Sequence, residues 1–280
     1  MTKRRTDLSY QNESYIRYNM SKLSDRIEQY TSISDHKLMA KLPIIICING
    51  CNFSKVTQFL DKPYCMKFSM CIEKVMLRLC NKVDGVIFAY QFNDEIILLL
   101  RTDQNVDTEM WYNGFLQKIC SVTSSAATLY FNEAATALEL NLTGEAIFTA
   151  KVFGVPNQAE AVNTIVYYQQ QNFHTSIQSA CLYNLLNKYD KNTIKDMLAG
   201  LNIDGKIDLL FQECQINYND YPISFRRGTA AYKIPKIVGS DMKNKWVLNS
   251  ELPIFTKDAS FLSNIVKNGA DIFRQEGFNE

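Results

Sequence analysis

The sequence has few histidines and no closely spaced cysteine pairs. His36 and His174 are its 2 histidines, too few for a histidine-based metal centre. None of its 8 cysteines forms a CxxC pair, and most lie in apolar or helix-like segments. This pattern argues against a zinc site and favours buried, reduced thiols, so we expect a cytoplasmic protein.

Long hydrophobic runs and a strong net charge are also missing. Apolar segments such as "EIILLLR" are far too short to span a bilayer. The start of the chain, "MTKRRTDLSYQNESYIRYNM", is polar and lacks the apolar centre of a signal peptide, so we expect no membrane association. The formal net charge is only +1, so any contact with nucleic acid must depend on a local basic patch.

Several catalytic signatures are absent as well. The chain has no GxGxxG loop, no Walker-type phosphate loop, no GxSxG and no HExxH. What it does have is the material for a sizeable core, since 46% of its 280 residues are hydrophobic and 12% are aromatic. Its length suits one large domain or two small ones.

Hydrophobic periodicity predicts a β-α-β-β-α-β order in the middle of the chain. Apolar runs predict strands at 42–49, 85–92, 95–101 and 145–156, and helical spacing predicts helices at 62–83 and 108–131. Asn93 and Asp94 between the second and third strands form a hairpin turn signal. This order is typical of an α+β, ferredoxin-like sheet with its helices on one face.

The flanking segments are mostly helical in pattern. Residues 21–30 read as a short amphipathic helix, and 157–171 as a helix with Asn157 as N-cap and Glu160 at the capping-box position. Two more helices are predicted at 177–189 and 191–201, followed at 216–236 by a turn, a basic loop and a strand. The last ~40 residues show no clear pattern.

The first candidate site joins Asn49 and Gly50, at the end of the first strand, to Asp94 and Glu95 at the hairpin tip. In this fold the two strands are neighbours, so their ends meet. Carboxylates there could hold two Mg²⁺ ions around a nucleoside triphosphate, with the Gly50 carbonyl facing a metal. The alternative is that Asn93 and Asp94 form only a hairpin turn.

Three further candidates rest on weaker patterns. Arg226 and Arg227 in "FRRGTAAYK" could bind phosphate groups. The alternative is that they belong to a solvated basic loop without a ligand. Lys118, in an otherwise neutral helical stretch, could contact a triphosphate. The alternative is that its side chain only extends along the surface into solvent. His174 in "YYQQQNFHTS" is an acid–base candidate, although a polar helix end is the alternative reading.

Taken together in order, these segments resemble the tRNAHis guanylyltransferases and their 3′-to-5′ polymerase relatives. "LSDRIEQY" is similar to the family's opening helix, and "LPIIICINGCNF" to its R-x-D-G-R-x-F strand, followed by "KPYCMKF" for K-P-F-D. "YQFNDEIILLL" is similar to its S-D-E hairpin, and "IFTAKVFGVPNQAEAVNTIVYYQQ" to F-D-x-R-v-f-x-P and W-R-Q. "INYNDYPISFRRGTAAYK" is similar to its N-Y-N and R-K-G segment. The resemblance spans residues 22–236.

The resemblance implies a polymerase-type palm domain that adds nucleotides to the 5′ end of tRNA with two Mg²⁺ ions and with GTP and ATP as substrates. It implies a homotetramer, or a hetero-oligomer with a paralogue. We expect a flexible segment at 1–21, a guanylyltransferase-like palm domain with a helical extension at 22–236, and a variable segment at 237–280.

The resemblance also assigns roles residue by residue. It implies catalytic roles for Asp94 and Glu95, and metal contacts for Asn49, Gly50 and Asp94. For the nucleotide it implies contacts from Gly50, Cys51, Asn52, Phe53, Asn93 and Lys118. For the RNA it implies contacts from Lys151, Arg226 and Arg227.

Charge has been lost at many of these positions. The family's Asp is Asn49 here, and the arginines beside it are Cys47 and Cys51; the remaining replacements are Asn93, Thr149, Lys151, Tyr168 and Gln171. A neutral amide oxygen is a poorer Mg²⁺ ligand than a carboxylate and cannot bridge two ions in the same way. Three hypotheses stay open: a divergent active enzyme, a pseudoenzyme subunit that binds tRNA or an active paralogue, and a structural or nucleotide-responsive protein.

Overall fold

The computed structural model describes residues 22–105, 107–238 and 241–269. The segment 1–21, which we expect to be flexible, lies outside the described residues. The core of the chain is an antiparallel six-stranded sheet in the order β4-β1-β3-β2-β5-β6. Its strands are β1 (Ile44–Gly50), β2 (Val86–Phe92), β3 (Glu95–Leu100), β4 (Phe148–Gly154), β5 (Thr229–Val238) and β6 (Asp241–Asn249).

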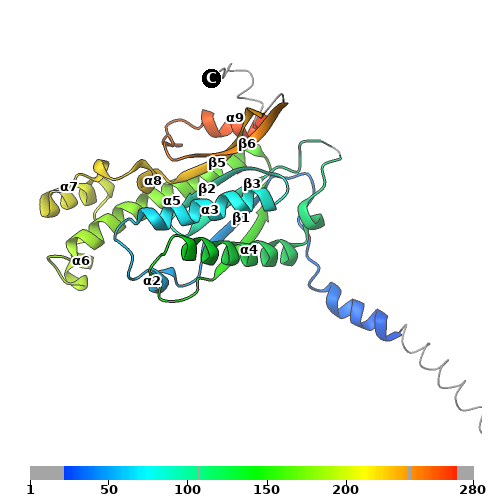
Figure 1. Ribbon diagram of the computed structural model, residues 1–280, viewed down its shortest axis with the longest axis horizontal. Coiled ribbons are helices and arrows are strands. Elements are labelled where there is room, and N and C mark those ends of the chain that lie inside the picture. The colour runs from blue at the N-terminus through cyan, green and yellow to red at the C-terminus, as the bar shows by residue number, and fades with distance from the viewer. Residues whose placement is uncertain (1–21, 106, 239–240, 270–280) are drawn as a thin grey trace, which may run out of the picture.

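The predicted β-α-β-β-α-β unit is confirmed. Between the first four strands lie α3 (Met66–Lys82) and α4 (Leu116–Ala137), which pack together on one face of the sheet (Figure 1). The second of these helices starts later than the predicted residue 108. Tyr112 and Asn113, in a short 3-10 turn (Trp111–Gly114), have φ values of 48° and 51°, which an α-helix does not allow.

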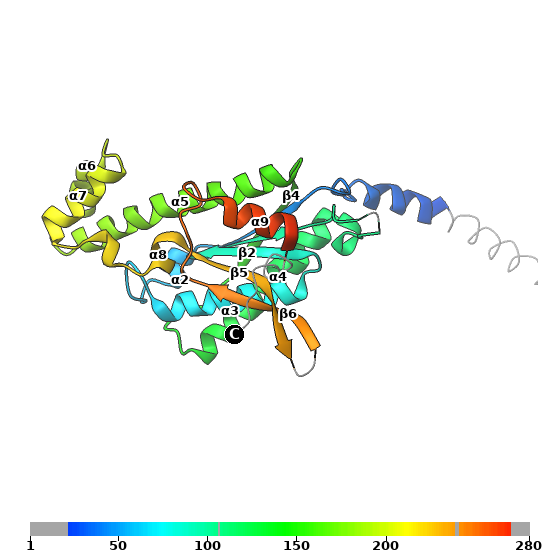
Figure 2. The same ribbon diagram turned by 90° about the horizontal axis from the view of Figure 1, so that it is seen from above.

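The two helices of the β-α-β-β-α-β unit lie on one face of the sheet, as expected. The opposite face is covered by α5 (Gln158–Leu185) and α9 (Ser260–Asn268), which pack on apolar residues of β1, β2, β3 and β5 (Figure 2). Because the central strands are buried on both faces, they read as continuous apolar runs rather than as an alternating pattern.

Helix α5 is one continuous helix where the sequence suggested two. The polar run that we read as a helix end lies in its middle, and three of its side chains are buried with partners from distant elements. Gln169 Oε1 accepts from the Phe255 amide at 2.7 Å, and Asn172 donates to the Tyr90 hydroxyl at 3.2 Å. The Ser176 hydroxyl lies 2.5 Å from that of Tyr218. His174 faces solvent on the same helix.

The C-terminal half of α5 carries a separate small core. It packs against α6 (Lys191–Leu198), α7 (Ile203–Cys214), a 3-10 turn (Tyr218–Asp220) and α8 (Ile223–Arg227). The sequence pattern did not reveal α7. Arg226 and Arg227 lie on α8, a short helix, and not on the loop that we expected.

The segment after residue 236 continues the same sheet. The expected domain limit at 236 falls inside β5, and β6 pairs with β5 along its whole length. Helix α9 packs on the central strands, so this segment contributes to the core.

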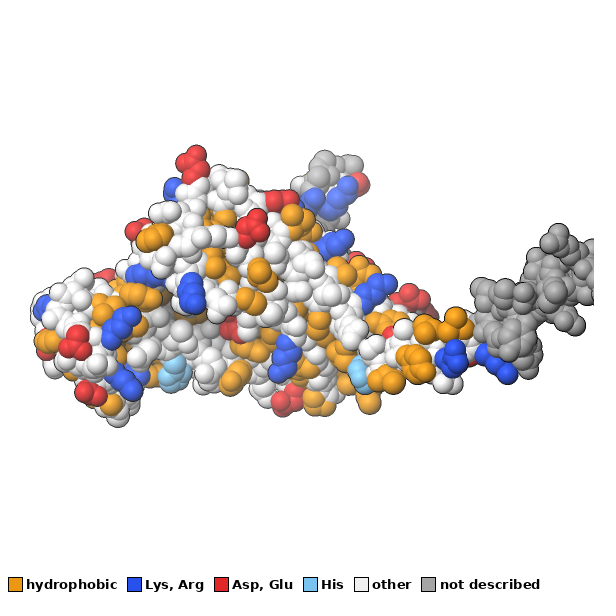
Figure 3. All heavy atoms as spheres, turned by 90° about the horizontal axis from the view of Figure 1, so that it is seen from below, with side chains coloured by type: hydrophobic (Ala, Val, Ile, Leu, Met, Phe, Trp, Pro, Cys, Tyr) orange, Lys and Arg blue, Asp and Glu red, His pale blue; other side chains and the backbone are white. Residues whose placement is uncertain are grey.

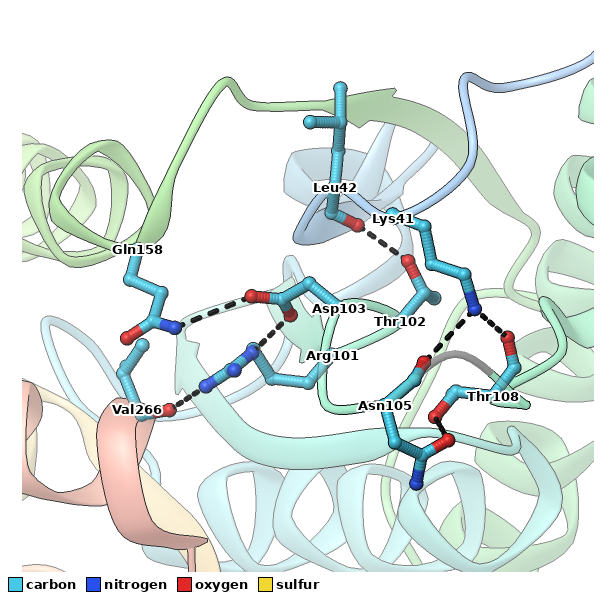
Figure 4. Close-up of polar contacts among 9 residues, drawn as sticks. All are labelled: Lys41, Leu42, Arg101, Thr102, Asp103, Asn105, Thr108, Gln158 and Val266. Carbon is cyan, nitrogen blue, oxygen red and sulfur yellow. Dashed lines mark hydrogen bonds and ion pairs between the residues drawn. The ribbon is translucent and has the colours of Figure 1, made fainter.

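A buried polar cluster fastens α9 to the body at the far end of β3. The Arg101 side chain, 5% exposed, pairs with Asp103 and donates to the Val266 carbonyl of α9 (Figure 4). Asp103 also accepts from Gln158, at the start of α5, at 3.3 Å. The Arg101 guanidinium therefore links the end of β3 directly to α9, and through Asp103 to the start of α5.

The helix at residues 22–32 stands away from the body, with apolar side chains gathered along this arm (Figures 1 and 3). Across the described ranges of the chain, no helix is both long and apolar enough to cross a membrane.

Candidate active site

The strand end and the hairpin tip that carry the predicted site do meet. Asn49 is directly opposite Glu95 in the β1–β3 ladder, and the Gly50 amide donates to the Asp94 carbonyl at 3.2 Å. The strand order follows from the ferredoxin-like topology, which places β1 beside β3. The prediction that Asn49 and Asp94 lie on adjacent strand ends is confirmed.

The side chain of Asn49 acts as a hydrogen-bond donor in this arrangement. The atoms around the carboxamide are acceptors, so its nitrogen is assigned to face them, and in that orientation it donates to Glu95 Oε1 at 3.2 Å and to the Ile48 carbonyl at 2.9 Å. An aspartate at this position has no donor when ionised and would repel Glu95. The amide therefore does more than remove a charge, because it binds the neighbouring carboxylate.

Two positions where the resemblance implies arginine, Cys47 and Tyr168, also contact each other. The Cys47 thiol lies 2.9 Å from the Tyr168 hydroxyl on α5. Burial raises the pKa of Cys47 to about 11, so the thiol stays neutral at neutral pH. Lys151 pairs with Cys47 from β4, and its side chain is exposed. A neutral thiol–phenol contact therefore occupies the face of β1 that α5 covers.

The two carboxylates of the site have raised pKa values. Burial raises the pKa of Asp94 by more than the backbone amides of Asp94 and Gly50, and then the charge of Lys62, lower it. Burial, and then the charge of Asp94, raise the pKa of Glu95 to about 7. The site therefore concentrates negative charge that the protein itself compensates poorly.

A cavity of ≈190 Å³ opens beside Asp94. Its walls include the aromatic rings of Phe53 and Phe68, and its polar groups include Lys62 and Asn93. Burial lowers the pKa of Lys62, whose Nζ donates to the Thr57 hydroxyl at 3.3 Å. Our assignment of site residues omitted Lys62, although it is the first residue of the quoted segment "KPYCMKF".

The turn after β1 is tightly built around Gly50. A Cβ atom at this position would lie 2.1 Å from the Phe53 ring, so no other residue fits without a shift. Asn52 adopts a left-handed conformation with φ 53°, and the Cys51 amide donates to the Ile147 carbonyl at 2.7 Å. Phe53 is buried against Phe131 and Phe148, which holds the turn against the core.

The remaining predicted residues lie apart from this cavity or are already engaged. Lys118, in the first turn of α4, lies with Nζ 4.9 Å from the Tyr112 ring centroid and lines a separate hollow of ≈840 Å³. Arg226 donates to the Tyr221 carbonyl at 2.9 Å, and Arg227 to the Leu252 carbonyl at 2.9 Å. Both arginines follow Phe225, which lines the cavity beside Asp94.

Comparison with known proteins shows which family shares this sequence and fold. The profile of the tRNAHis guanylyltransferases matches residues 24–156, which include both strand ends of the site. The chain is a divergent member of the tRNAHis guanylyltransferase family. A probable tRNAHis guanylyltransferase of Dictyostelium discoideum is 23% identical, over 71% of this chain and 78% of its own length. An uncharacterised protein of Acanthamoeba polyphaga mimivirus is 22% identical over 88% of both chains.

Solved structures of this guanylyltransferase family share the fold. A bacterial tRNAHis guanylyltransferase-like protein in complex with ATP superposes with a TM-score of 0.76 and 27% identity, covering 87% of this chain and 99% of the other. The complex of such a bacterial protein with GTP gives a TM-score of 0.70 and 26% identity, covering 88% and 99%.

The residues of this guanylyltransferase relative suit one magnesium ion better than two. Asp94 and Glu95 are poorly neutralised carboxylates, which is the donor chemistry that Mg²⁺ favours. Two ions need a charged ligand from β1 as well, and Asn49 instead presents its amide nitrogen to Glu95. Among the described residues, no group of three or more His, Cys, Asp or Glu is placed to hold a metal.

Proposed function

We propose that the protein binds a nucleoside triphosphate, GTP or ATP, beside Asp94 and adds nucleotides to the 5′ end of a tRNA. Family membership and the structural similarity to nucleotide-bound relatives support this proposal. The observation that carries it is the position of Asp94, which meets Gly50 from the neighbouring strand end and lines a cavity with aromatic walls. Aromatic walls suit a nucleobase, and Lys62 supplies a cation for phosphate oxygens.

In this proposal, the residues of the chain mainly position the substrates and neutralise the negative charge of their phosphates. In the family reaction, the 3′ hydroxyl of the incoming nucleotide attacks the activated 5′ phosphate of the tRNA, and the activating group leaves as AMP or pyrophosphate. A magnesium ion, held by Asp94 with the Gly50 carbonyl, would supply charge neutralisation at the phosphates. Glu95, in contact with Asn49, is a second carboxyl group beside Asp94, and its pKa is raised to about 7. Lys151, Arg226 and Arg227 are proposed RNA contacts. Lys118, which lines its own hollow, is a proposed triphosphate contact.

A single-ion site should react slowly, because one of two charged metal ligands is missing. We therefore propose transfer that is slow relative to relatives with aspartate at position 49. The same observation favours a second candidate function, a pseudoenzyme subunit that binds tRNA or an active paralogue. Incorporation of labelled GTP into a 5′-activated tRNA supports transfer, and tRNA binding without incorporation supports the pseudoenzyme.

The variant Asn49→Asp tests the proposed ligand loss. Restoring a carboxylate should tighten Mg²⁺-dependent GTP binding by about tenfold, which corresponds to about 1.4 kcal/mol, because a second charge joins Asp94. Isothermal titration with GTP, with and without Mg²⁺, measures this gain.

The matched control is Asn81→Asp. Asn81 is exposed near the C-terminal end of α3 and does not line the cavity beside Asp94, so the same substitution adds the same charge away from the site. We expect no gain in this control. If wild type already binds Mg²⁺-GTP tightly and transfers quickly, and Asn49→Asp changes neither, the amide is a competent ligand and the argument is wrong.

We also propose a homotetramer, or a hetero-oligomer with a paralogue. Leu23, Ile27, Tyr30 and Ile33 follow helical spacing on the projecting arm and are 47%, 50%, 65% and 74% exposed. Such a stripe is typical of a surface that another chain covers. Light scattering at micromolar concentration should give a mass several times 32.2 kDa, and a monodisperse monomer would contradict the proposal.

A further inference from the structure

The β5–β6 hairpin extends beyond the rest of the sheet. Strand β2 pairs with β5 only as far as Tyr232, opposite Phe88. From Lys233 onward, β5 pairs with β6 alone. In Figure 2 this part stands away from the body. Ile234 and Trp246 still pack against the core clusters, whereas Lys236, Ile237, Met242 and Lys243 further out are exposed.

One face of this hairpin concentrates lysines. Lys236 is directly opposite Lys243, and Lys245 follows two residues later on the same face. Like charges directly opposite each other destabilise a strand pair. Within the described part of the chain, none of the three lysines forms an ion pair with a carboxylate. Asp241 is the acidic residue on this face, at the end of the hairpin, opposite Val238.

The other face of the hairpin has a different character. Lys233 lies with Nζ 5.0 Å from the Trp246 ring centroid, so its charge is held by a cation–π contact. Ile237 and Met242, which face each other, are 78% and 59% exposed. The lysine face therefore differs from the rest of the hairpin in having charge without a protein partner.

We propose that Lys236, Lys243 and Lys245 bind the phosphodiester backbone of the RNA substrate. Phosphates placed between opposed lysines turn a repulsive pair into a binding site. A chain with a net charge of +1 needs such a local patch to hold RNA. The choice of RNA as the occupant rests on the proposed function.

The position of the lysines also sets which part of the RNA they reach. Thr229 lies opposite Gln91, close to the hairpin tip that carries Asp94. Lys236 is seven residues further along β5, about 23 Å at about 3.3 Å per residue. The contact therefore falls on backbone about 23 Å from the reacting end, which is several base pairs along an A-form RNA stem. Only an RNA that spans this distance uses the lysines.

The test compares tRNA binding by wild type and by Lys236→Gln/Lys243→Gln over a range of salt concentrations. Each lysine that contacts phosphate contributes about 0.7–0.9 to the slope of log affinity against log salt. We expect the double variant to lower the slope by about 1.5 and the affinity by about tenfold at 0.15 M salt. A duplex RNA end of about three base pairs should bind both proteins equally, because it cannot reach the hairpin.

The matched control is Lys191→Gln/Lys195→Gln, which removes two exposed lysines from α6. We expect this control to leave the slope within about 0.3 of wild type. An equal effect of the two double variants would reduce the result to overall charge and overturn the proposal. An unchanged slope in the hairpin variant, or no binding of tRNA by wild type, would overturn it as well.

Two further readouts separate this proposal from its alternatives. Removing an opposed like-charge pair should leave the melting temperature unchanged or raise it, so weaker RNA binding cannot be attributed to unfolding. If the hairpin lysines change binding to phosphatidylserine vesicles but not to tRNA, the surface serves a membrane and the proposal fails.

GTP affinity should be unchanged in the hairpin variant. Hairpin-dependent tRNA binding without GTP incorporation would leave this inference standing and refute transfer, whereas incorporation without hairpin dependence would refute this inference alone.

Discussion

The variant Asp94→Ala is expected to abolish Mg²⁺-dependent GTP binding and to lower nucleotide transfer by about 10²-fold or more. Asp94 lines the cavity that also contains Lys62, and its backbone carbonyl accepts from the Gly50 amide at the neighbouring strand end. With Asn49 already neutral, the site has no other charged ligand that faces this cavity from either strand end. GTP titrations with and without Mg²⁺, and incorporation of labelled GTP into tRNA, measure the two losses.

The same variant should not cost stability. Because burial raises the pKa of Asp94, the ionised carboxylate is disfavoured in the folded protein at neutral pH, and alanine relieves that cost. The control is Asp61→Ala, an exposed aspartate that lines the same cavity, for which we expect less than about a threefold change. Retained activity in Asp94→Ala would show that the reaction centre lies elsewhere.

The variant Phe131→Ala should give the largest loss of stability, about 3–5 kcal/mol in urea unfolding. Phe131 of α4 is fully buried, and its ring centroid lies 5.2 Å from that of Phe53 and 5.9 Å from that of Phe68. Truncation leaves a cavity that the surrounding rings fill only in part. Leu129→Ala, on the same helix but 55% exposed, should cost less than about 0.5 kcal/mol.

Phe131→Ala should also weaken GTP binding under conditions where the protein is still folded. Phe53 and Phe68, which pack on Phe131, line the cavity beside Asp94. Loss of their support should let the cavity walls move. Unchanged GTP affinity in the folded variant would mean that the nucleotide does not use this cavity.

The order of the central elements was predictable from local pattern alone. Strands β1 and β3 are apolar on both faces, α3 has apolar residues at helical spacing, and Asn93 with Asp94 marks the hairpin. The ferredoxin-like topology then follows, because this order has few ways to form an antiparallel sheet. It also brings Asn49 and Asp94 to neighbouring strand ends, so the location of the candidate site was predictable as well.

The course of α5 depended on tertiary contacts. Gln169, Asn172 and Ser176 looked like a helix end, since polar residues inside an apolar helix cost free energy unless they are hydrogen-bonded. Their partners, Tyr90, Phe255 and Tyr218, come from elements far away in the sequence. No local pattern can show that such partners exist.

The character of the site was likewise decided by strand pairing. The resemblance to the family implied that Asn49 stands in place of an aspartate and that Cys47 and Tyr168 stand in place of arginines. Only the structure shows that the Asn49 amide binds Glu95 and that Cys47 contacts Tyr168. Hydrogen bonds and pKa shifts arise from groups brought within a few ångströms, and which groups those are is set by register and packing. The residue types were therefore determined by the sequence, and their electrostatic balance by the tertiary structure.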